Sequence, residues 1–320
     1  MIWYDSSAEG LETTLFSGVS VRRNLEDYPF SQRLDRASGD EIFEKVRSAL
    51  KDREFESFDL SLLSVYERGE LYEKGYLAKD SKYLLFSEKQ GVFISLLSSD
   101  HIEIRAFSGG LSPSLALERA LEIDRILDSA LNYAFDGRLG YITALPENLG
   151  CAIRFFARLF LPALEESISS PKIRSAASDS DLGVYSSGGY FYDVYTKGSL
   201  GYTEKELCEK LSSFAKRISY SEIEKRESLY RTELPFITDR IMRSLGTVRY
   251  ARLISESEVT RLYADLRLGI YLEAEGYKCD YKLLDKIMAG ALPNALSISS
   301  AKEKDRDAAR AQYLSKALAV

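Results

Sequence analysis

The sequence is poor in the residues that metal sites and disulfide frameworks need. Its 320 residues include one histidine, His101, and three cysteines, an odd number of widely spaced thiols. No two cysteines form a Cys-x-x-Cys pair, so neither a zinc site nor a disulfide framework is expected. Free, scattered thiols are typical of a protein in a reducing cytoplasm.

Long apolar runs and an excess of positive charge are also lacking. No segment is long and apolar enough to cross a membrane, and the first residues lack the basic and apolar regions of a signal peptide. The formal net charge of −6 at pH 7 argues against a protein that binds nucleic acid. We therefore expect a cytoplasmic protein that binds neither nucleic acid nor membrane.

The composition is that of an ordinary globular protein, with 45% hydrophobic and 29% charged residues. The length allows one large domain and a smaller one. Strand and helix patterns mix over the first two thirds of the chain, whereas the last third shows helical patterns alone. The fold class predicted from these patterns is α+β followed by an all-α segment.

Several local patterns predict individual elements. Alternating residues predict strands over residues 15–21 and 102–107, and residues 92–97 are predicted to form another strand. Only four residues separate 92–97 from 102–107, which predicts an antiparallel hairpin. Asp40 is expected to cap a helix, and residues 61–74 to form a second helix with Leu62 and Val65 directed inward.

Further along the chain, residues typical of helix ends mark three positions. Ser112-Pro113 is expected to open a long helix. Proline lacks a backbone N–H, but an N–H in the first turn of a helix would have no partner within the helix, so its absence costs nothing there. Thr203 and Glu206 form a capping-box pattern at the start of another helix. Pro235 predicts a break near a domain boundary, which we place between residues 1–232 and 233–320.

One segment, residues 140–154, combines a β-prone start, a turn containing Pro146 and Gly150, and a charged Arg154 in an apolar setting. A charge in such a setting is costly without a partner, so Arg154 is a candidate ligand for an anion or one member of a structural ion pair. Glu147 and Glu103 are its candidate partners.

The same segment resembles the run G-Y-L-T-x-C-P-T-N-x-G-T-x-L-R-A of phosphagen kinases and of the related bacterial protein arginine kinases. Residues 239–253 and 265–270 resemble C-terminal runs of the second group. The resemblance implies a phosphagen-kinase catalytic fold, an antiparallel sheet flanked by helices, followed by a helical dimerisation domain. It also implies ATP:guanido phosphotransferase chemistry with ATP and magnesium, a homodimer, and a Clp-type unfoldase and a zinc-finger activator as partners.

The motifs that carry this chemistry are altered. Against the family run S-R-V-R-L-A-R-N-L, Gly18 and Ser20 replace two phosphate-binding arginines, and Arg23 remains. In the hairpin, Ser99 occupies the position of the glutamate that would hold the substrate guanidinium, and Glu103 replaces an arginine. The glycine-rich flap, residues 182–189, has neither the arginine nor the glutamate of the family.

These losses predict a pseudokinase with no intact catalytic residue that acts as a scaffold or phosphoarginine reader in protein quality control. The remnant nucleotide-binding residues would be Arg23, His101, Asn148 and Arg154. One alternative is an active kinase with a rebuilt site. In that case the register differs at Gly18 or in the flap, and one of three other arginines substitutes: Arg22, Arg105 or Arg158. A structural subunit paired with a competent paralogue is a further alternative.

Near the C-terminus, Arg306, Asp307 and Arg310 resemble a phosphoarginine-reading run, R-D-R-R-R-A, of protein arginine kinases. Arg306 and Arg310 are four residues apart and therefore share a helical face. Arginines suit the phosphate of phosphoarginine and a carboxylate suits its guanidinium. The alternative is a charged helix face in contact with solvent.

Overall fold

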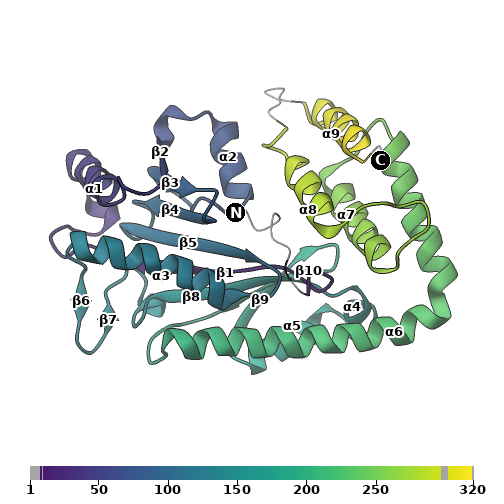
Figure 1. Ribbon diagram of the computed structural model, residues 1–320, viewed down its shortest axis with the longest axis horizontal. Helices are drawn as coiled ribbons and strands as arrows, with labels where there is room; N and C mark the ends of the chain where they lie inside the picture. Colours follow the sequence, from purple (N-terminus) through teal and green to yellow (C-terminus); the bar gives the residue numbers. More distant parts are fainter. Residues whose placement is uncertain (1–7, 9, 297–301, 319–320) are drawn as a thin grey trace.

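The computed structural model describes residues 8, 10–296 and 302–318. Within them, the chain forms an eight-stranded antiparallel sheet with helices on both faces, followed by a group of helices at the C-terminal end (Figure 1). This arrangement confirms the predicted fold class. No helix in this part of the chain is long and apolar enough to cross a membrane.

The sheet has the strand order β2-β3-β4-β5-β1-β8-β10-β9. Its strands are β1 (Thr14–Arg23), β2 (Glu56–Asp59), β3 (Tyr83–Ser87), β4 (Val92–Leu96), β5 (Ile102–Gly109), β8 (Ile153–Phe160), β9 (Leu182–Gly188) and β10 (Phe191–Thr196). A separate ribbon joins β6 (Phe135–Asp136) and β7 (Gly140–Tyr141). The predicted hairpin is confirmed, because β4 and β5 pair antiparallel with Leu96 opposite Ile102.

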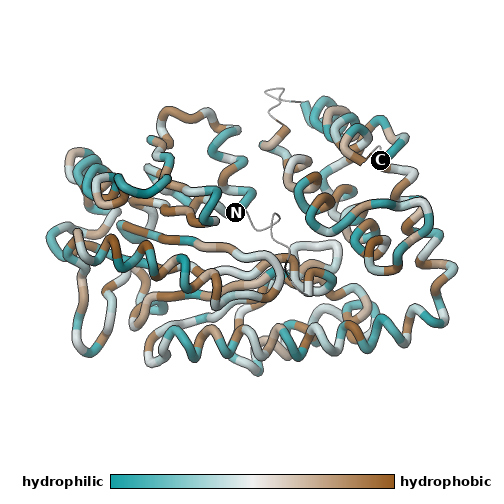
Figure 2. Tube along the Cα trace, viewed as in Figure 1, coloured by the Kyte–Doolittle hydropathy of each residue, from teal (hydrophilic) through white to brown (hydrophobic). Residues whose placement is uncertain are grey.

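The α-helices are α1 (Arg36–Ala49), α2 (Val65–Glu73), α3 (Pro113–Ala130), α4 (Pro162–Ile168), α5 (Ser170–Asp179), α6 (Glu204–Tyr250), α7 (Glu256–Tyr271), α8 (Tyr281–Gly290) and α9 (Glu303–Ala317). Helices α3, α5 and α6 pack against one side of the sheet, which we call the helix face. The main core lies there, with Val19 and Val21 of β1 against α3 and α6. Figure 2 shows apolar residues concentrated along the central strands.

The opposite side of the sheet, which we call the cavity face, is covered only in part. Its aromatic side chains, Phe16, Phe107 and Phe160 among them, pack against Ala264 and Leu268 of α7. A third core cluster holds α7, α8, α9 and the end of α6 together. Because β1 has helices behind it and this aromatic layer in front, it is buried along its whole length.

Two predicted helix starts are wrong. Asp35, not Asp40, caps α1 and accepts a hydrogen bond from the Ser38 N–H at 2.8 Å, because it directly precedes the first helical residue. Helix α2 starts at Val65 behind a capping box made by Ser64, so the predicted start at residue 61 is four residues early. Leu62 and Val65, expected inward, are 82% and 71% exposed.

Pro235 lies inside α6 and does not end it. A proline in a helix removes one N–H donor and commonly kinks the helix. The turn around Pro235 is exposed, so water can satisfy the freed carbonyl, while Tyr230 and Ile237 are buried on either side. The long helix bends before its end (Figure 1) and runs through the predicted boundary between the two domains.

A fully buried ion pair anchors α6 to the rest of the fold. Glu222 accepts hydrogen bonds from the backbone N–H groups of Ala163 and Leu164 at 3.1 and 2.8 Å, at the start of α4. Arg226 donates to Glu222 at 2.6 Å and to the Phe160 carbonyl at 3.3 Å. Each charge has partners, so the pair connects α6, α4 and β8 without leaving an isolated buried charge.

We therefore expect Glu222→Ala to lower the free energy of unfolding by about 3–5 kcal/mol, because Arg226 would be left buried without its counter-ion. Urea unfolding followed by circular dichroism measures the change. Glu224→Ala, an exposed change one half-turn away, is the matched control and should alter stability by less than about 0.5 kcal/mol. A loss below about 1 kcal/mol for Glu222→Ala would contradict the assigned role.

Candidate functional site: an arginine-lined cavity

A cavity of about 620 Å³ lies on the cavity face of the sheet, between the end of α2 and helices α7 and α8. Side chains alternate along a strand, so every second residue of β1, β5 and β8 points into it. The charged side chains that line it from these strands are Arg22, Glu103, Arg105, Arg154 and Arg158.

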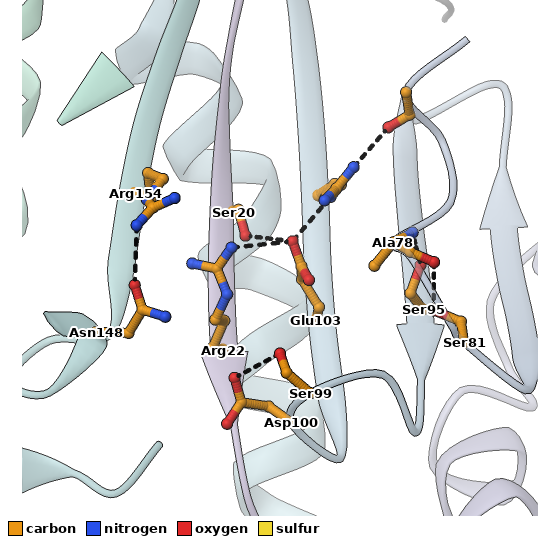
Figure 3. Close-up of polar contacts among 12 residues, drawn as sticks. Ser20, Arg22, Ala78, Ser81, Ser95, Ser99, Asp100, Glu103, Asn148 and Arg154 are labelled. Atoms are coloured by element: carbon orange, nitrogen blue, oxygen red, sulfur yellow. Dashed lines mark hydrogen bonds and ion pairs between the residues drawn. The ribbon is translucent and has the colours of Figure 1, made fainter. Parts of the chain in front are cut away.

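Glu103 occupies the centre of this group. Its Oε1 accepts hydrogen bonds from Ser20 Oγ at 2.8 Å, Arg105 Nε at 2.8 Å and Arg22 Nη2 at 3.3 Å (Figure 3). Burial alone would raise the pKa of this carboxyl. The guanidinium groups of Arg105 and Arg22, with the Ser20 hydroxyl, outweigh burial and lower the pKa to about 2. Glu103 is therefore a fixed negative charge at neutral pH.

Arg154 has a separate set of partners. Its Nη2 lies 3.3 Å from Glu147 Oε1, 3.3 Å from Asn148 Oδ1 (Figure 3) and 3.4 Å from the Lys197 carbonyl oxygen. The predicted ion pair with Glu147 is thus confirmed. The alternative pair with Glu103 is not formed, because Arg22 and Arg105 already take that carboxylate.

Arg158 forms a bidentate pair with a carboxylate of the neighbouring strand. Its Nε and Nη2 donate to Asp193 Oδ1 and Oδ2 at 2.7 and 2.9 Å, and its guanidinium lies 5.3 Å from the centre of the Phe16 ring. Asp193 also accepts a hydrogen bond from the Ser187 hydroxyl. Four arginines therefore line the cavity in the described part of the chain, and each is paired with a carboxylate of the same chain.

A contact between the two parts of the chain lies at the edge of the cavity, where Glu73 belongs to its lining. Glu73, at the end of α2, accepts hydrogen bonds from the backbone N–H and Nδ2 of Asn294 at 3.1 and 2.6 Å. A Cβ added at Gly69 would lie 2.5 Å from Asn294 Cγ, so a side chain at this position would displace the Asn294 amide. The contact joins α2 to the segment that follows α8.

Two models of known protein families match this chain. Residues 39–225 match the model described as "ATP:guanido phosphotransferase, C-terminal catalytic domain", which is more than half of the chain. The chain belongs to the ATP:guanido phosphotransferase family. Residues 235–320 match a second model, "Protein-arginine kinase McsB C-terminal domain", which confirms the resemblance to the protein arginine kinases of this family.

Individual relatives agree with this assignment. The chain is 28% identical to a protein-arginine kinase of Caldanaerobacter subterraneus over 98% of both chains. It is 32% identical to one of Staphylococcus saprophyticus over 82% of both. Lombricine kinase, at 17% identity and a TM-score of 0.58 over 68% of both chains, shares the fold. A taurocyamine kinase from Schistosoma mansoni, at 19% identity and a TM-score of 0.62, shares it over 82% of this chain and 40% of its own.

Of the remnant residues predicted for this family member, only Arg154 lines the cavity. Asn148 is buried behind it and positions its guanidinium. Arg23 points to the helix face, where its Nη2 donates to Asp124 at 2.6 Å and its guanidinium lies 3.5 Å from the centre of the Tyr141 ring. Because Arg23 is one residue beyond Arg22 on β1, the two necessarily lie on opposite faces.

His101 and Ser99 also lie away from the cavity. His101 Nδ1 accepts from the Leu25 N–H at 3.0 Å, and its Nε2 lies 2.8 Å from the Pro29 carbonyl oxygen, to which it donates. Burial lowers the His101 pKa, which keeps the ring neutral. Ser99 lies in the turn between β4 and β5, and its carbonyl accepts from Gln32 Nε2 at 3.2 Å. Both residues hold the hairpin in place.

In the C-terminal helix α9, the structure brings together Asp307 and Arg310. Arg310 is only 2% exposed and donates to Asp307 Oδ1 at 2.7 Å, to the Ile254 carbonyl at 2.7 Å and to the Ala291 carbonyl at 3.3 Å. These bonds attach α9 to the segments that follow α6 and α8. Arg306 is half-buried on the same helix.

From the sequence, Arg22, Arg105 and Arg158 were expected only as substitutes, although all three line the cavity. The sequence held a signal for Arg22, because strand alternation places it on the same face as Gly18 and Ser20, the positions at which the resemblance implies arginines. Asp193 was missed entirely, because no motif marks it and only the pairing of β10 with β8 places it opposite Arg158.

The depressed pKa of Glu103 predicts a pH-dependent contribution to stability. In the unfolded chain this carboxyl returns to about 4.3. Its contribution is therefore complete at neutral pH and is lost as the pH falls toward its folded pKa of about 2. Urea unfolding of the native chain and of Glu103→Gln should show a stability gap that narrows between about pH 5 and pH 2.5. A gap independent of pH would contradict the ionised, arginine-bound state of Glu103.

Proposed function

We propose that this protein-arginine-kinase-like protein is a pseudokinase that acts by binding, as a scaffold in protein quality control. The observation that supports the proposal is the charge balance of the cavity. Arg22 and Arg105 share Glu103, Arg154 is paired with Glu147, and Arg158 with Asp193. Three carboxylates therefore offset three of the four positive charges that a polyphosphate would need.

The energies of these pairs argue against tight nucleotide binding. A triphosphate is held by guanidinium groups that grip its oxygens at two points each, and a hydrogen bond to a charged group contributes about 1.5–3 kcal/mol. Here a nucleotide would first have to separate ion pairs, and Glu103 would still repel its phosphates. Since one transition-state arginine is worth roughly 10³–10⁵ in rate, phosphoryl transfer would be slow even with ATP and magnesium present.

A second candidate is an active ATP-dependent protein-arginine phosphotransferase with a rebuilt site. It is favoured by the four guanidinium groups that line one cavity. In this case the ion pairs of Arg22, Arg105 and Arg154 would open toward the phosphates of ATP. Asp193 or Glu73, whose carboxylates line the same cavity, would orient the substrate guanidinium.

The proposal extends to partners. A homodimer, a Clp-type unfoldase, a zinc-finger activator and proteins carrying phosphoarginine are the partners we propose, with a competent kinase paralogue as an alternative. Support comes from the match of residues 235–320 to the C-terminal domain of a protein-arginine kinase. The use of Asp307 and Arg310 in internal bonds leaves Arg306 as the residue through which we propose phosphoarginine reading.

A kinase assay separates the two candidate functions. The full-length chain, incubated with magnesium ATP and an arginine-rich protein, should produce no acid-labile phosphoarginine above the background without enzyme. The double variant Ser20→Arg/Glu103→Arg should bind magnesium ATP at least about tenfold more tightly by calorimetry, because it removes the repelling carboxylate and adds two guanidinium groups. Multiple turnovers by the unchanged chain would instead establish the second candidate.

A further inference from the structure

The eight-stranded sheet has two edge strands, β2 and β9, which lie at its opposite ends (Figure 1). An edge strand presents unpaired N–H and C=O groups to which another chain can add, and a short length, charged residues or proline usually prevent this. β2 has four residues, of which the first is Glu56 and the last is Asp59. β9 has seven residues, and none of them is charged or proline. Of the two edges, β9 therefore lacks the usual protection.

Hydrogen bonds between β8 and β10 show how the backbone of β10 is oriented. Successive residues of an antiparallel strand bond alternately to the neighbour on one side and to the neighbour on the other. The Leu161 N–H, at the end of β8, donates to the Tyr190 carbonyl at 3.0 Å. Even-numbered residues of β10 therefore bond to β8, and odd-numbered residues bond to β9.

This orientation identifies the unpaired backbone groups of β9. Tyr185 is opposite Asp193, an odd-numbered residue, so Tyr185 bonds to β10. Its neighbours Val184 and Ser186 then direct their N–H and C=O groups away from the sheet. In the described part of the chain, β9 pairs with no strand other than β10. Ser186 is exposed and Val184 is partly exposed, so four backbone groups at this edge can accept a partner.

The surroundings of this edge fit one added strand. Side chains alternate along β9, so Val184 packs with the main core on the helix face and Tyr185 lines the cavity. The turn after β9 packs against α7, because a Cβ added at Gly189 would lie 2.8 Å from the Thr260 carbonyl oxygen. At the other end, Leu182 is buried. A single extended chain fits the short edge between these limits more readily than the sheet of a second folded domain.

We propose that the free edge of β9, residues 184–187, binds an extended, uncharged segment of another polypeptide, which pairs with Val184 and Ser186 as an additional strand. This inference rests on the proposed scaffold function and names its partner class. In strand addition, main-chain hydrogen bonds supply the affinity, and side chains contribute the selectivity. Recognition of this kind suits a scaffold that holds unfolded proteins of different sequence.

Fluorescence anisotropy with the full-length chain tests the proposal. The probe is a blocked, fluorescein-labelled octapeptide in which valine and threonine alternate. We expect it to bind, and we expect Ser186→Pro to weaken binding by about fivefold or more, because proline removes one outward N–H and no bond to β10. Ser186→Ala, which keeps this N–H, is the matched control and should leave the affinity unchanged.

Methylated peptides keep the test decisive if Ser186→Pro fails to fold, because they are used with the unchanged chain. N-methyl groups on the threonines leave the valine N–H groups free to pair, so this peptide should still bind. N-methyl groups on all central residues block both edges of the peptide, so binding should be lost. Binding that survives full methylation would show that side chains alone are recognised and would overturn the inference.

Hydrogen exchange followed by NMR locates the bound peptide. Exchange of the Val184 and Ser186 amide protons should slow by about tenfold or more on binding, whereas the Tyr185 amide, already bonded to β10, should change little. Self-association that Ser186→Pro abolishes, without peptide binding, would assign the edge to a second copy and overturn the proposal. Absence of peptide binding also overturns it, while the proposed scaffold function stands. Phosphoarginine formation in the kinase assay would refute that function whatever the peptide result.

Discussion

The cavity of this protein depends on one carboxylate, Glu103, which is bonded at the same time to Ser20, Arg22 and Arg105. A buried negative charge of this kind is tolerated only when positive groups surround it. It fixes the side chains of Arg22 and Arg105 on two neighbouring strands and offsets one of their two positive charges. This carboxylate therefore joins the charged side chains of β1 and β5 into a network of internal ion pairs.

The two faces of the sheet have different roles: one packs against helices, and the other lines the cavity. On the helix face, apolar residues of β1, β5 and β8 pack against α3 and α6, and Arg23 is tied to Asp124. On the cavity face, the polar residues of the same strands line the cavity and form ion pairs with one another. Because the main core lies on the helix face, the charged groups of the cavity face do not interrupt its packing.

The C-terminal helices complete the cavity as well as the fold. Helix α6 continues from the sheet into this region, and the buried pair of Glu222 and Arg226 fixes its position against α4. Asn294 then returns to Glu73 of α2. The walls of the cavity thus come from segments more than two hundred residues apart, and their separation is set by α6 and by this contact.

The fold class, the hairpin, the capped start of α6 and the family could be predicted from the sequence, because periodicity, capping residues and motif spacing are local properties of the chain. That two phosphate-binding arginines of the family are replaced by Gly18 and Ser20 stays a prediction from the sequence. Tertiary structure alone decided that Arg22 faces the cavity and Arg23 does not, that Asp193 neutralises Arg158, and that Arg310 is used inside the C-terminal helices. Such outcomes depend on strand register and on contacts between distant segments, and neither is written in any local stretch of residues.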